Sequence, residues 1–508
     1  MRGLRRTMAV ALLAFAIVAT LLVVGCGATN GGGVSVTRRV AVRQTALHQA
    51  AVPDRATASY PAIASRPDTA SHRATVSQAD EPWLLVSDIH FTPFVGADKA
   101  TIAKLEAAPV SDWAGILAAE GNTPSGYGQD TNDALLSGSL ATMQNAAPSP
   151  PVVIIAGDLL AHDFEQTYDG LAPHPTQASY DAFVDKTFTY LAERFNAAFP
   201  LAQFVLTLGN NDSYCGDYRA TPRSAFLAHT AQEWEPLVDR NGRAPDFASS
   251  FPKLGSYVAR LPGSNLDAIA LDDVFWSRKY DNACGSRTED PGAEQAKWLA
   301  ATMKHLPASE HALLVTHVPP GIDVYGTLHG SGAPVPLLGS SGQESMLRAL
   351  RKGRVRALIF GHLHMSTYRL SRDTPMLGVP SISPVNGNNP AFLSATVDPD
   401  GTIADYTAYA LQLGASTPQW QREYDFRETY GLPAFDGPSL KRLQGLLKDD
   451  AALRADYEHY YVSGGKHPIS DAEYPAYACG SVALQVTAFA TCWHPVYKSG
   501  KRNPGSTK

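Results

Sequence analysis

The chain has few cysteines and no excess of basic charge. Only five of its 508 residues are cysteine, and none form a Cys-x-x-Cys pair, so a metal site of that type is excluded. The formal net charge of -6 argues against a nucleic-acid-binding face, which needs clustered basic residues. Hydrophobic residues make up 44%, which is typical of a globular protein and too few for many membrane spans.

The N-terminus has the pattern of an export signal. Three arginines precede an almost purely apolar stretch from Met8 to Val24, and Gly25 leads into Cys26. This pattern predicts a secretory signal over residues 1–25. The cysteine after Val-Val-Gly resembles a bacterial lipobox, which implies lipidation of Cys26 and anchoring to a membrane. A plain signal peptide or a single anchor helix is the alternative. We expect an envelope lipoprotein, or a periplasmic or secreted protein.

The remaining cysteines are even in number. In an oxidising compartment, that favours disulfides over free buried thiols. Three pairings are possible, and we expect the one that joins sequence neighbours. Those pairs are Cys215–Cys284 and Cys479–Cys492.

The chain divides into segments of different composition. Residues 26–80 are rich in small residues and show no sustained period, which indicates a flexible tether. From Trp83, short apolar runs alternate with helical patterns, which predicts an α/β layered catalytic domain over residues 81–408. For residues 409–508 we expect a small helical module, with helices over Trp420–Thr429 and Leu440–Tyr461.

Five of the apolar runs are predicted strands, and polar residues follow each of them directly. In parallel sheets, ligands bind at the carboxyl ends of strands, so these polar residues are expected to lie together. In chain order they are Asp88 and His90, Asp158, Asn210, His317, and His362 with His364.

Each of these motifs alone has low specificity, and their order is the informative feature. Carboxylate and imidazole ligands suit Zn, Mn or Fe and disfavour Mg or Ca. Two such divalent cations, close together, can clamp the attacking and leaving oxygens of a phosphoryl displacement. The sequence therefore predicts two divalent metal ions and a phosphoester substrate.

Over residues 83–408 this ordered set resembles the calcineurin-like metallophosphoesterase superfamily. The resemblance implies its layered fold of central β-sheets flanked by helices. It implies attack on phosphorus by a hydroxide that bridges the two metals. It also implies a first site of Asp88, His90, Asp158 and His364, a bridging role for Asp158, and a second site completed by Asn210, His317 and His362.

A narrower resemblance covers nearly the whole chain after residue 80. The segment Gly157–Asp163 resembles Gly-Asp-x-x-x-His-Asp of acid sphingomyelinase and its phosphodiesterase-like relatives. Residues 420–424 and 427–433 and the closing cysteine pair are similar to the C-terminal module of the same group. This implies a phosphodiesterase, with a lipid among the candidate substrates.

One position departs from the superfamily pattern. Where most members have Gly-Asn-His, this chain has Gly209-Asn210-Asn211. Asn211 can donate a hydrogen bond to a phosphate oxygen but cannot deliver a proton near pH 7. The variant is similar to that of vacuolar endopolyphosphatases, so hydrolysis of polyphosphate or a nucleotide anhydride is the alternative function. A surface lipoprotein that binds metal without turnover is a remote alternative.

His162, four residues after Asp158, is the candidate general acid because an imidazole there can reach the leaving oxygen. The alternative is that it only holds a loop in place. The segment Asp130–Asp133 is interpreted first as a helix N-cap. Its position also resembles a family segment near the substrate cleft.

Overall fold

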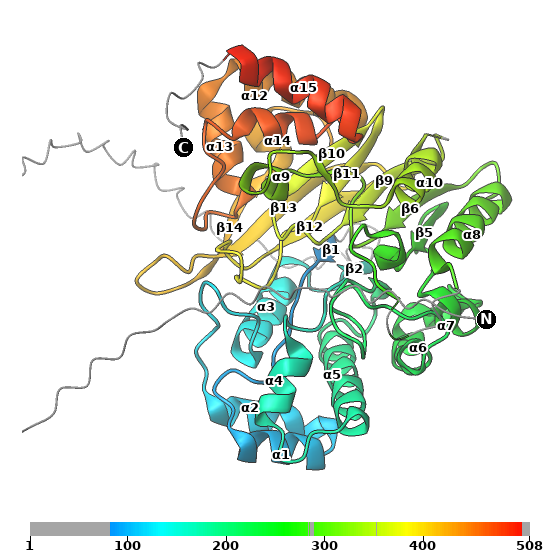
Figure 1. Ribbon diagram of the computed structural model, residues 1–508, viewed down its shortest axis with the longest axis vertical. Coiled ribbons are helices and arrows are strands. Elements are labelled where there is room, and N and C mark those ends of the chain that lie inside the picture. The colour runs from blue at the N-terminus through cyan, green and yellow to red at the C-terminus, as the bar shows by residue number, and fades with distance from the viewer. Residues whose placement is uncertain (1–81, 283, 285–288, 352, 500–508) are drawn as a thin grey trace, which may run out of the picture. The chain divides into compact units, whose positions relative to one another are not determined.

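The computed structural model describes residues 82–282, 284, 289–351 and 353–499. The expected signal peptide, Cys26 and the tether lie outside these residues. Two six-stranded mixed sheets form the centre of the described part (Figure 1). Both sheets contain a parallel core with antiparallel strands added at the side.

The first sheet has the order β14-β13-β12-β1-β2-β3 and the second β10-β11-β9-β6-β5-β4, with a separate β7–β8 pair. The strands are β1 (Trp83–Val86), β2 (Val152–Ala156), β3 (Gln203–Thr207), β4 (Tyr257–Arg260), β5 (Leu266–Ala270), β6 (His311–Val315), β7 (Ile322–Asp323), β8 (Val335–Pro336), β9 (Val355–Phe360), β10 (Thr367–Ser371), β11 (Thr374–Gly378), β12 (Ala391–Val397), β13 (Ile403–Leu411) and β14 (Trp420–Asp425). All five apolar runs predicted as strands before the polar residues are strands, namely β1, β2, β3, β6 and β9.

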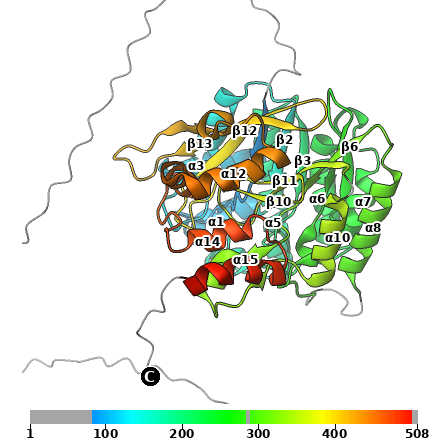
Figure 2. The same cartoon turned by 90° about the horizontal axis from the view of Figure 1, so that it is seen from above.

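Helices flank the two sheets. They are α1 (Lys99–Ala107), α2 (Trp113–Glu120), α3 (Asp133–Ala146), α4 (Phe164–Leu171), α5 (Gln177–Ala198), α6 (Ala225–Val238), α7 (Phe247–Leu254), α8 (Pro291–His305), α9 (Val324–His329), α10 (Ser340–Leu350), α11 (Phe426–Tyr430), α12 (Gly437–Asp449), α13 (Ala451–Tyr461), α14 (Tyr474–Gly480) and α15 (Val486–Ser499). Helices α8 and α10 lie side by side on the second sheet (Figure 2).

Strand β6 shows why the central strands are mainly apolar. Successive side chains of a strand point to opposite faces. Leu313 and Val315 join the core that the two sheets share, while Leu314 on the other face packs in the core that contains α8 and α10. Because both faces are covered, residues 312–315 of the strand are all apolar, and the next buried polar residues are Thr316 and His317, directly after its end.

The helix expected over Trp420–Thr429 is wrong in its first half. Residues Trp420–Asp425 form strand β14, which pairs antiparallel with β13, and a short helix, α11, begins only at Phe426. Pairing with β13 supplies the backbone partners, and the Tyr424 side chain is buried, so tertiary context outweighs the local helical pattern. The boundary expected at 408/409 falls within β13. The helical segment expected over Leu440–Tyr461 is two helices, α12 and α13.

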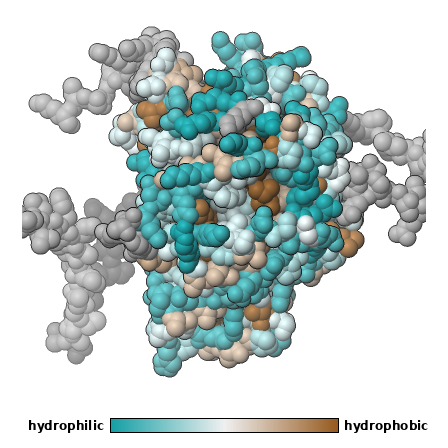
Figure 3. Space-filling view, turned by 90° about the vertical axis from the view of Figure 1, so that its right-hand side faces the viewer, coloured by the Kyte–Doolittle hydropathy of each residue, from teal (hydrophilic) through white to brown (hydrophobic). Residues whose placement is uncertain are grey.

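Both expected disulfides are present, joining Cys215 to Cys284 and Cys479 to Cys492. Two disulfides are consistent with a location outside the cytoplasm. Among the described residues, no helix combines the length and apolar character needed to cross a membrane. The face in Figure 3 is mainly hydrophilic, with hydrophobic residues in small separate groups.

Candidate metal centre

Most of the seven predicted ligands have an unusual backbone conformation. Asp88, His90, Asp158, His362 and His364 have φ between 44° and 69°, in the left-handed region that non-glycine residues rarely adopt. Such strain persists where the surrounding structure requires it, and it concentrates at functional sites. Here it lets side chains from separate strand ends turn toward one point.

The first group combines side chains from the ends of β1, β2 and β9. Nε2 of His90 lies 3.1 Å from Nε2 of His364 and 3.4 Å from Oδ2 of Asp158. Nε2 of His364 lies 3.4 Å from Oδ1 of Asp88. All four side chains are buried. Two imidazole nitrogens facing each other and two carboxylates form a donor set that fits a shared cation.

The second group adjoins the first through Asp158. Oδ2 of Asp158 lies 3.1 Å from Nε2 of His317, and that nitrogen lies 3.1 Å from Oδ1 of Asn210. Donor atoms of Asp158, His317 and His362 all lie within 4.8 Å of one another. Asp158 is therefore placed between the two groups. This buried cluster is consistent with a dimetal site.

Two of the predicted ligands, Asn210 and His362, directly follow a glycine, and neighbouring atoms leave no room there for a side chain. A Cβ at Gly209 would lie 2.1 Å from Oδ1 of Asp158, and one at Gly361 would lie 2.0 Å from Oγ of Ser87. A side chain at Gly209 would collide with Asp158, and one at Gly361 would collide with Ser87, whose hydroxyl contacts Asp88. Glycine is required there by the close approach of neighbouring groups.

The outer ring nitrogens of two histidines are held by backbone carbonyls. Nδ1 of His90 lies 3.0 Å from the carbonyl oxygen of Leu160, and Nδ1 of His317 lies 2.8 Å from that of Ala156. A hydrogen bond from Nδ1–H fixes the tautomer and leaves Nε2 as a ligand atom directed into the cluster.

Mutual electrostatics show that the cluster attracts positive charge. Burial lowers the pKa of His317, but the negative charge of Asp158 outweighs it and raises the pKa to about 10. His90 follows the same pattern, with a pKa of about 9. Burial raises the pKa of Asp88, yet His364 and His90 bring it down to about 2. Carboxylates that stabilise protons on nearby imidazoles would also stabilise divalent cations that replace those protons.

Two buried aspartates support the loops that carry this cluster, and the sequence analysis did not assign them a role. Asp212 accepts hydrogen bonds from the backbone N–H groups of Leu159, Leu160 and Gly209, at 2.8–3.0 Å. Asp273 accepts from the backbone N–H groups of His317, at 3.1 Å, and of the next residue, at 3.0 Å. Asp212 closes the Gly-Asn-Asn-Asp motif and could have been found there. Asp273 had no sequence signal.

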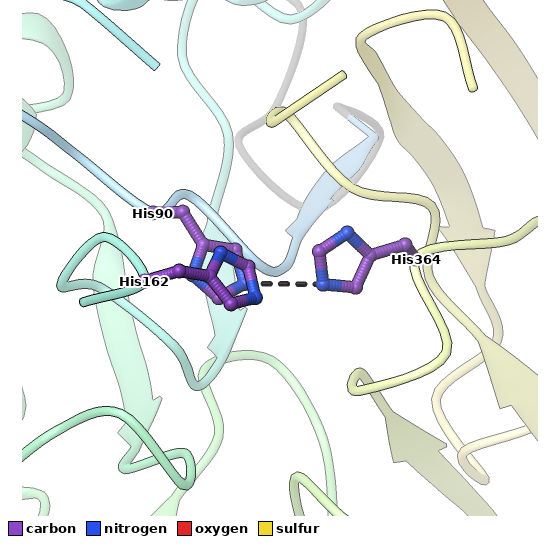
Figure 4. A group of neighbouring side chains, drawn as sticks. All are labelled: His90, His162 and His364. Atoms are coloured by element: carbon purple, nitrogen blue, oxygen red, sulfur yellow. Dashed lines mark hydrogen bonds between the residues drawn. The ribbon is translucent and has the colours of Figure 1, made fainter. Parts of the chain in front are cut away.

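His162 lies beside the first group. Its ring stacks on that of His90, with centroids 4.1 Å apart and an interplanar angle of 17° (Figure 4). Nδ1 of His162 lies 3.1 Å from Oδ1 of Asp130, and Oδ2 of Asp130 accepts the backbone N–H of His162 at 2.8 Å. The His162 side chain is 41% exposed, unlike that of His90.

The helix N-cap expected in the segment Asp130–Asp133 is confirmed, while Asp130 itself has a different role. The N-cap of α3 is Asn132, whose side chain accepts from the backbone N–H of Leu135 at 3.0 Å. Asp130 instead contacts His162 and accepts a hydrogen bond from Ser383 at 2.9 Å. Burial raises its pKa, but the contact with His162 and the charge of His90 lower it overall.

Asn211 contacts the carboxylate that the two groups share. Its side-chain Nδ2 donates to Oδ2 of Asp158 at 3.0 Å, and its backbone N–H donates to Oδ1 at 2.9 Å. The residue is buried. This contact orients Asp158, and a contact from Asn211 to phosphate stays a prediction.

A cavity of about 720 Å³ opens from the cluster at His362. Aliphatic side chains and five tyrosines line much of it, with basic and acidic groups at separate points. His329, which the sequence analysis did not single out as a site residue, lies there 3.5 Å from Glu473. Other lining residues include Tyr325, Met365, Tyr368, Arg369, Asn386, Tyr457, Tyr461, Lys466 and Tyr477.

Comparison with known proteins agrees with this geometry. Residues 82–366 match the calcineurin-like phosphoesterase family. The chain is 27% identical over 384 residues to sphingomyelinase phosphodiesterase D of Dictyostelium discoideum, covering 72% of this chain and 80% of that protein. It is 24% identical over 398 residues to human acid sphingomyelinase-like phosphodiesterase 3b, covering 73% and 81%.

A third relative is human sphingomyelin phosphodiesterase, at 24% identity over 396 residues, covering 71% of this chain and 54% of that protein. The family match spans more than half of the chain and ends two residues after His364. It therefore includes all five strand ends of the cluster. The chain belongs to the calcineurin-like phosphoesterase family, as a distant relative of the acid sphingomyelinase-like phosphodiesterases.

Proposed function

We propose that this protein is an exported, metal-dependent phosphodiesterase whose substrate carries a bulky organic group. The observation that carries the proposal is the position of the 720 Å³ cavity, which begins at His362 beside the buried His/Asp cluster. Pockets of this size and mixed lining suit organic ligands.

The ligands in this proposal are the seven predicted residues, in two groups that share Asp158. Their oxygen and nitrogen donors suit Zn, Mn or Fe. When bound, two such cations acidify water and neutralise charge on phosphoryl oxygens. The chain's own contribution is to hold the donors in place, through the left-handed strand ends and the carbonyls on His90 and His317.

His162 is the proposed general acid for the leaving oxygen. Asp130 accepts Nδ1–H, so the proton to be delivered stands on Nε2. The pair resembles other His–carboxylate pairs in which the carboxylate fixes the ring and its tautomer. This arrangement supplies the proton that Asn211, at the position where the superfamily pattern has histidine, cannot deliver.

Hydrolysis of polyphosphate or a nucleotide anhydride is the second candidate. Asn211 favours it, because an anhydride has a good leaving group and needs little protonation. The aliphatic and tyrosine lining of the cavity favours the diester, because inorganic polyphosphate has no apolar part to bury.

A substrate panel with matched variants separates these functions. Sphingomyelin, cyclic and linear nucleotides, polyphosphate and a small activated diester would be compared for kcat/KM. Met365→Ala and Tyr461→Ala should lower kcat/KM on the preferred bulky substrate about 10-fold or more, and hardly change it on the small diester. Polyphosphate as the best substrate, with no effect of either variant, would favour the anhydride function instead.

For the N-terminal part we propose a signal over residues 1–25, lipidation of Cys26 and a tether to residue 80. The apolar run and the two disulfides support export. Replacing Cys26 with Ser should move the protein from the membrane fraction to the soluble one. An unchanged distribution would contradict lipid anchoring. The division into a catalytic domain (81–408) and a C-terminal module (409–508) also stays a proposal.

A further inference from the structure

Residues 215–218 contact two predicted ligands of the second group, and no role has been assigned to them so far. They follow Asn211 in the chain, after β3, and include Cys215 of the first disulfide. Tyr218 is buried, whereas Asp217 and Cys215 are more exposed. Together these residues are called the 215–218 segment.

Tyr218 contacts the outer nitrogen of His362. Its hydroxyl oxygen lies 3.4 Å from Nε2 of His362, and the two rings meet edge to face with centroids 6.2 Å apart. In His90 and His317 the outer nitrogen is Nδ1. In His362 the outer nitrogen is Nε2 instead, so Nδ1 is the nitrogen that remains for the cluster. A metal-binding histidine commonly donates its other N–H to an oxygen that fixes the ring, and the Tyr218 hydroxyl can accept it.

Asp217 fixes the orientation of the Asn210 side chain in a similar way. Nδ2 of Asn210 donates to Oδ1 of Asp217 at 2.8 Å, which directs the opposite amide atom, Oδ1, to within 3.1 Å of Nε2 of His317. The backbone N–H of Tyr218 also donates to the carbonyl oxygen of Asn210 at 2.8 Å. Without these contacts, the amide could rotate its nitrogen toward the cluster, and an amide nitrogen does not bind cations.

The 215–218 segment is tied to a second segment of the chain at three points. Cys215 is bonded to Cys284. The backbone N–H of Asp281 donates to the carbonyl oxygen of Tyr218 at 3.0 Å. The ammonium of Lys279 lies 4.8 Å from the centre of the Tyr218 ring. The disulfide is the covalent tie among them, and it joins residues 69 apart in sequence.

We propose that Asp217 and Tyr218 are positioning residues for the second metal, and that the Cys215–Cys284 disulfide maintains its affinity. The inference rests on the proposed function, since it assumes that the two groups bind metal. None of these residues needs to touch the substrate. Among the described residues, no hydrogen bond or ring contact joins this segment to Asp88, His90 or His364, so the effect should be confined to one of the two metals.

The test is metal binding by the full chain, measured without turnover. Metal-free protein would be titrated with zinc against a competing chelator. Wild type should bind about two equivalents. Tyr218→Phe should weaken one equivalent by about 10- to 100-fold and leave the other unchanged. Tyr280→Phe is the matched control, because its hydroxyl binds the carbonyl oxygen of Ala220 and not a predicted ligand.

The disulfide is tested by a double variant, Cys215→Ser with Cys284→Ser, which should weaken the same equivalent. The matched control replaces Cys479 and Cys492 with Ser, since that disulfide joins α14 to α15. Two unweakened equivalents in Tyr218→Phe would overturn the inference, whether or not the double variant folds. Intact metal binding with weakened binding of inorganic phosphate would also overturn it and assign Tyr218 to the substrate. Wild type that binds no zinc would instead overturn the proposed function.

Discussion

The Nε2 atoms of His90 and His364 face each other at 3.1 Å, although 274 residues separate them in the chain. One follows β1 in the first sheet and the other follows β9 in the second. Two imidazole nitrogens at this distance need a cation or a proton between them. The site is therefore built where the strand ends of the two sheets meet.

Asp130 should affect catalysis through His162. With Asp130→Asn, the amide oxygen can still accept Nδ1–H, but the acceptor for the backbone N–H of His162 and the negative charge that stabilises a protonated ring are lost. We expect kcat/KM on a diester with a poor leaving group to fall at least about 10-fold, and to fall much less on an activated diester. His162→Ala should show the same selectivity to a greater degree. Equal slowing of both substrates would exclude proton delivery by this pair.

Asp212 should contribute to stability because it satisfies three buried backbone N–H groups. In Asp212→Asn, one oxygen becomes an amide nitrogen that cannot accept. We expect a loss of about 1–3 kcal/mol in the free energy of unfolding, measured by urea denaturation. The control Asp373→Asn changes an exposed carboxylate that pairs with Lys441 and should stay within about 0.5 kcal/mol. Similar values for both would contradict the role of Asp212.

Glu423 on β14 should make stability depend on pH. Both its carboxylate oxygens are buried and lack a hydrogen-bond partner among the described residues. Burial raises its pKa from 4.5 to about 8. The folded state therefore retains the proton where the unfolded state has lost it, so this group reduces stability as pH rises from about 4.5 to 8.

The neutral variant Glu423→Gln removes that dependence. Its melting temperature should exceed that of wild type by about 2 °C or more at pH 8, and by much less at pH 4. Thermal unfolding followed by circular dichroism at both pH values measures this. A variant less stable than wild type at pH 8 would show that the carboxylate has a stabilising partner.

The sequence allowed the fold class and the gathering of seven polar residues to be predicted for one physical reason. Strands buried on both faces are mainly apolar, so polar residues such as Asp158 and His317 stand out at their ends. The carboxyl ends of parallel strands share an edge, and the order of the motifs then points to one site.

Other parts depend on contacts between distant segments. Asp130 lies 32 residues before His162, in a segment whose local pattern is that of a cap. Tyr218 contacts His362 from 144 residues away. The backbone of Trp420–Asp425 finds its partner in β13, which the helical pattern of that segment does not reveal. In each case, the local sequence is compatible with another structure, and contacts with distant segments determine which structure forms.

The metal content of the full chain, measured together with its phosphodiesterase activity, tests whether the buried cluster is a dimetal phosphodiesterase site. Elemental analysis should find about two Zn, Mn or Fe ions per wild-type chain. Asp158→Asn should lose metal from both groups and abolish hydrolysis of an activated phosphodiester, because Asp158 is shared. A wild-type protein that holds no metal, and whose activity neither falls with a chelator nor rises with added Zn or Mn, would show that the protein is not a metal-dependent phosphodiesterase.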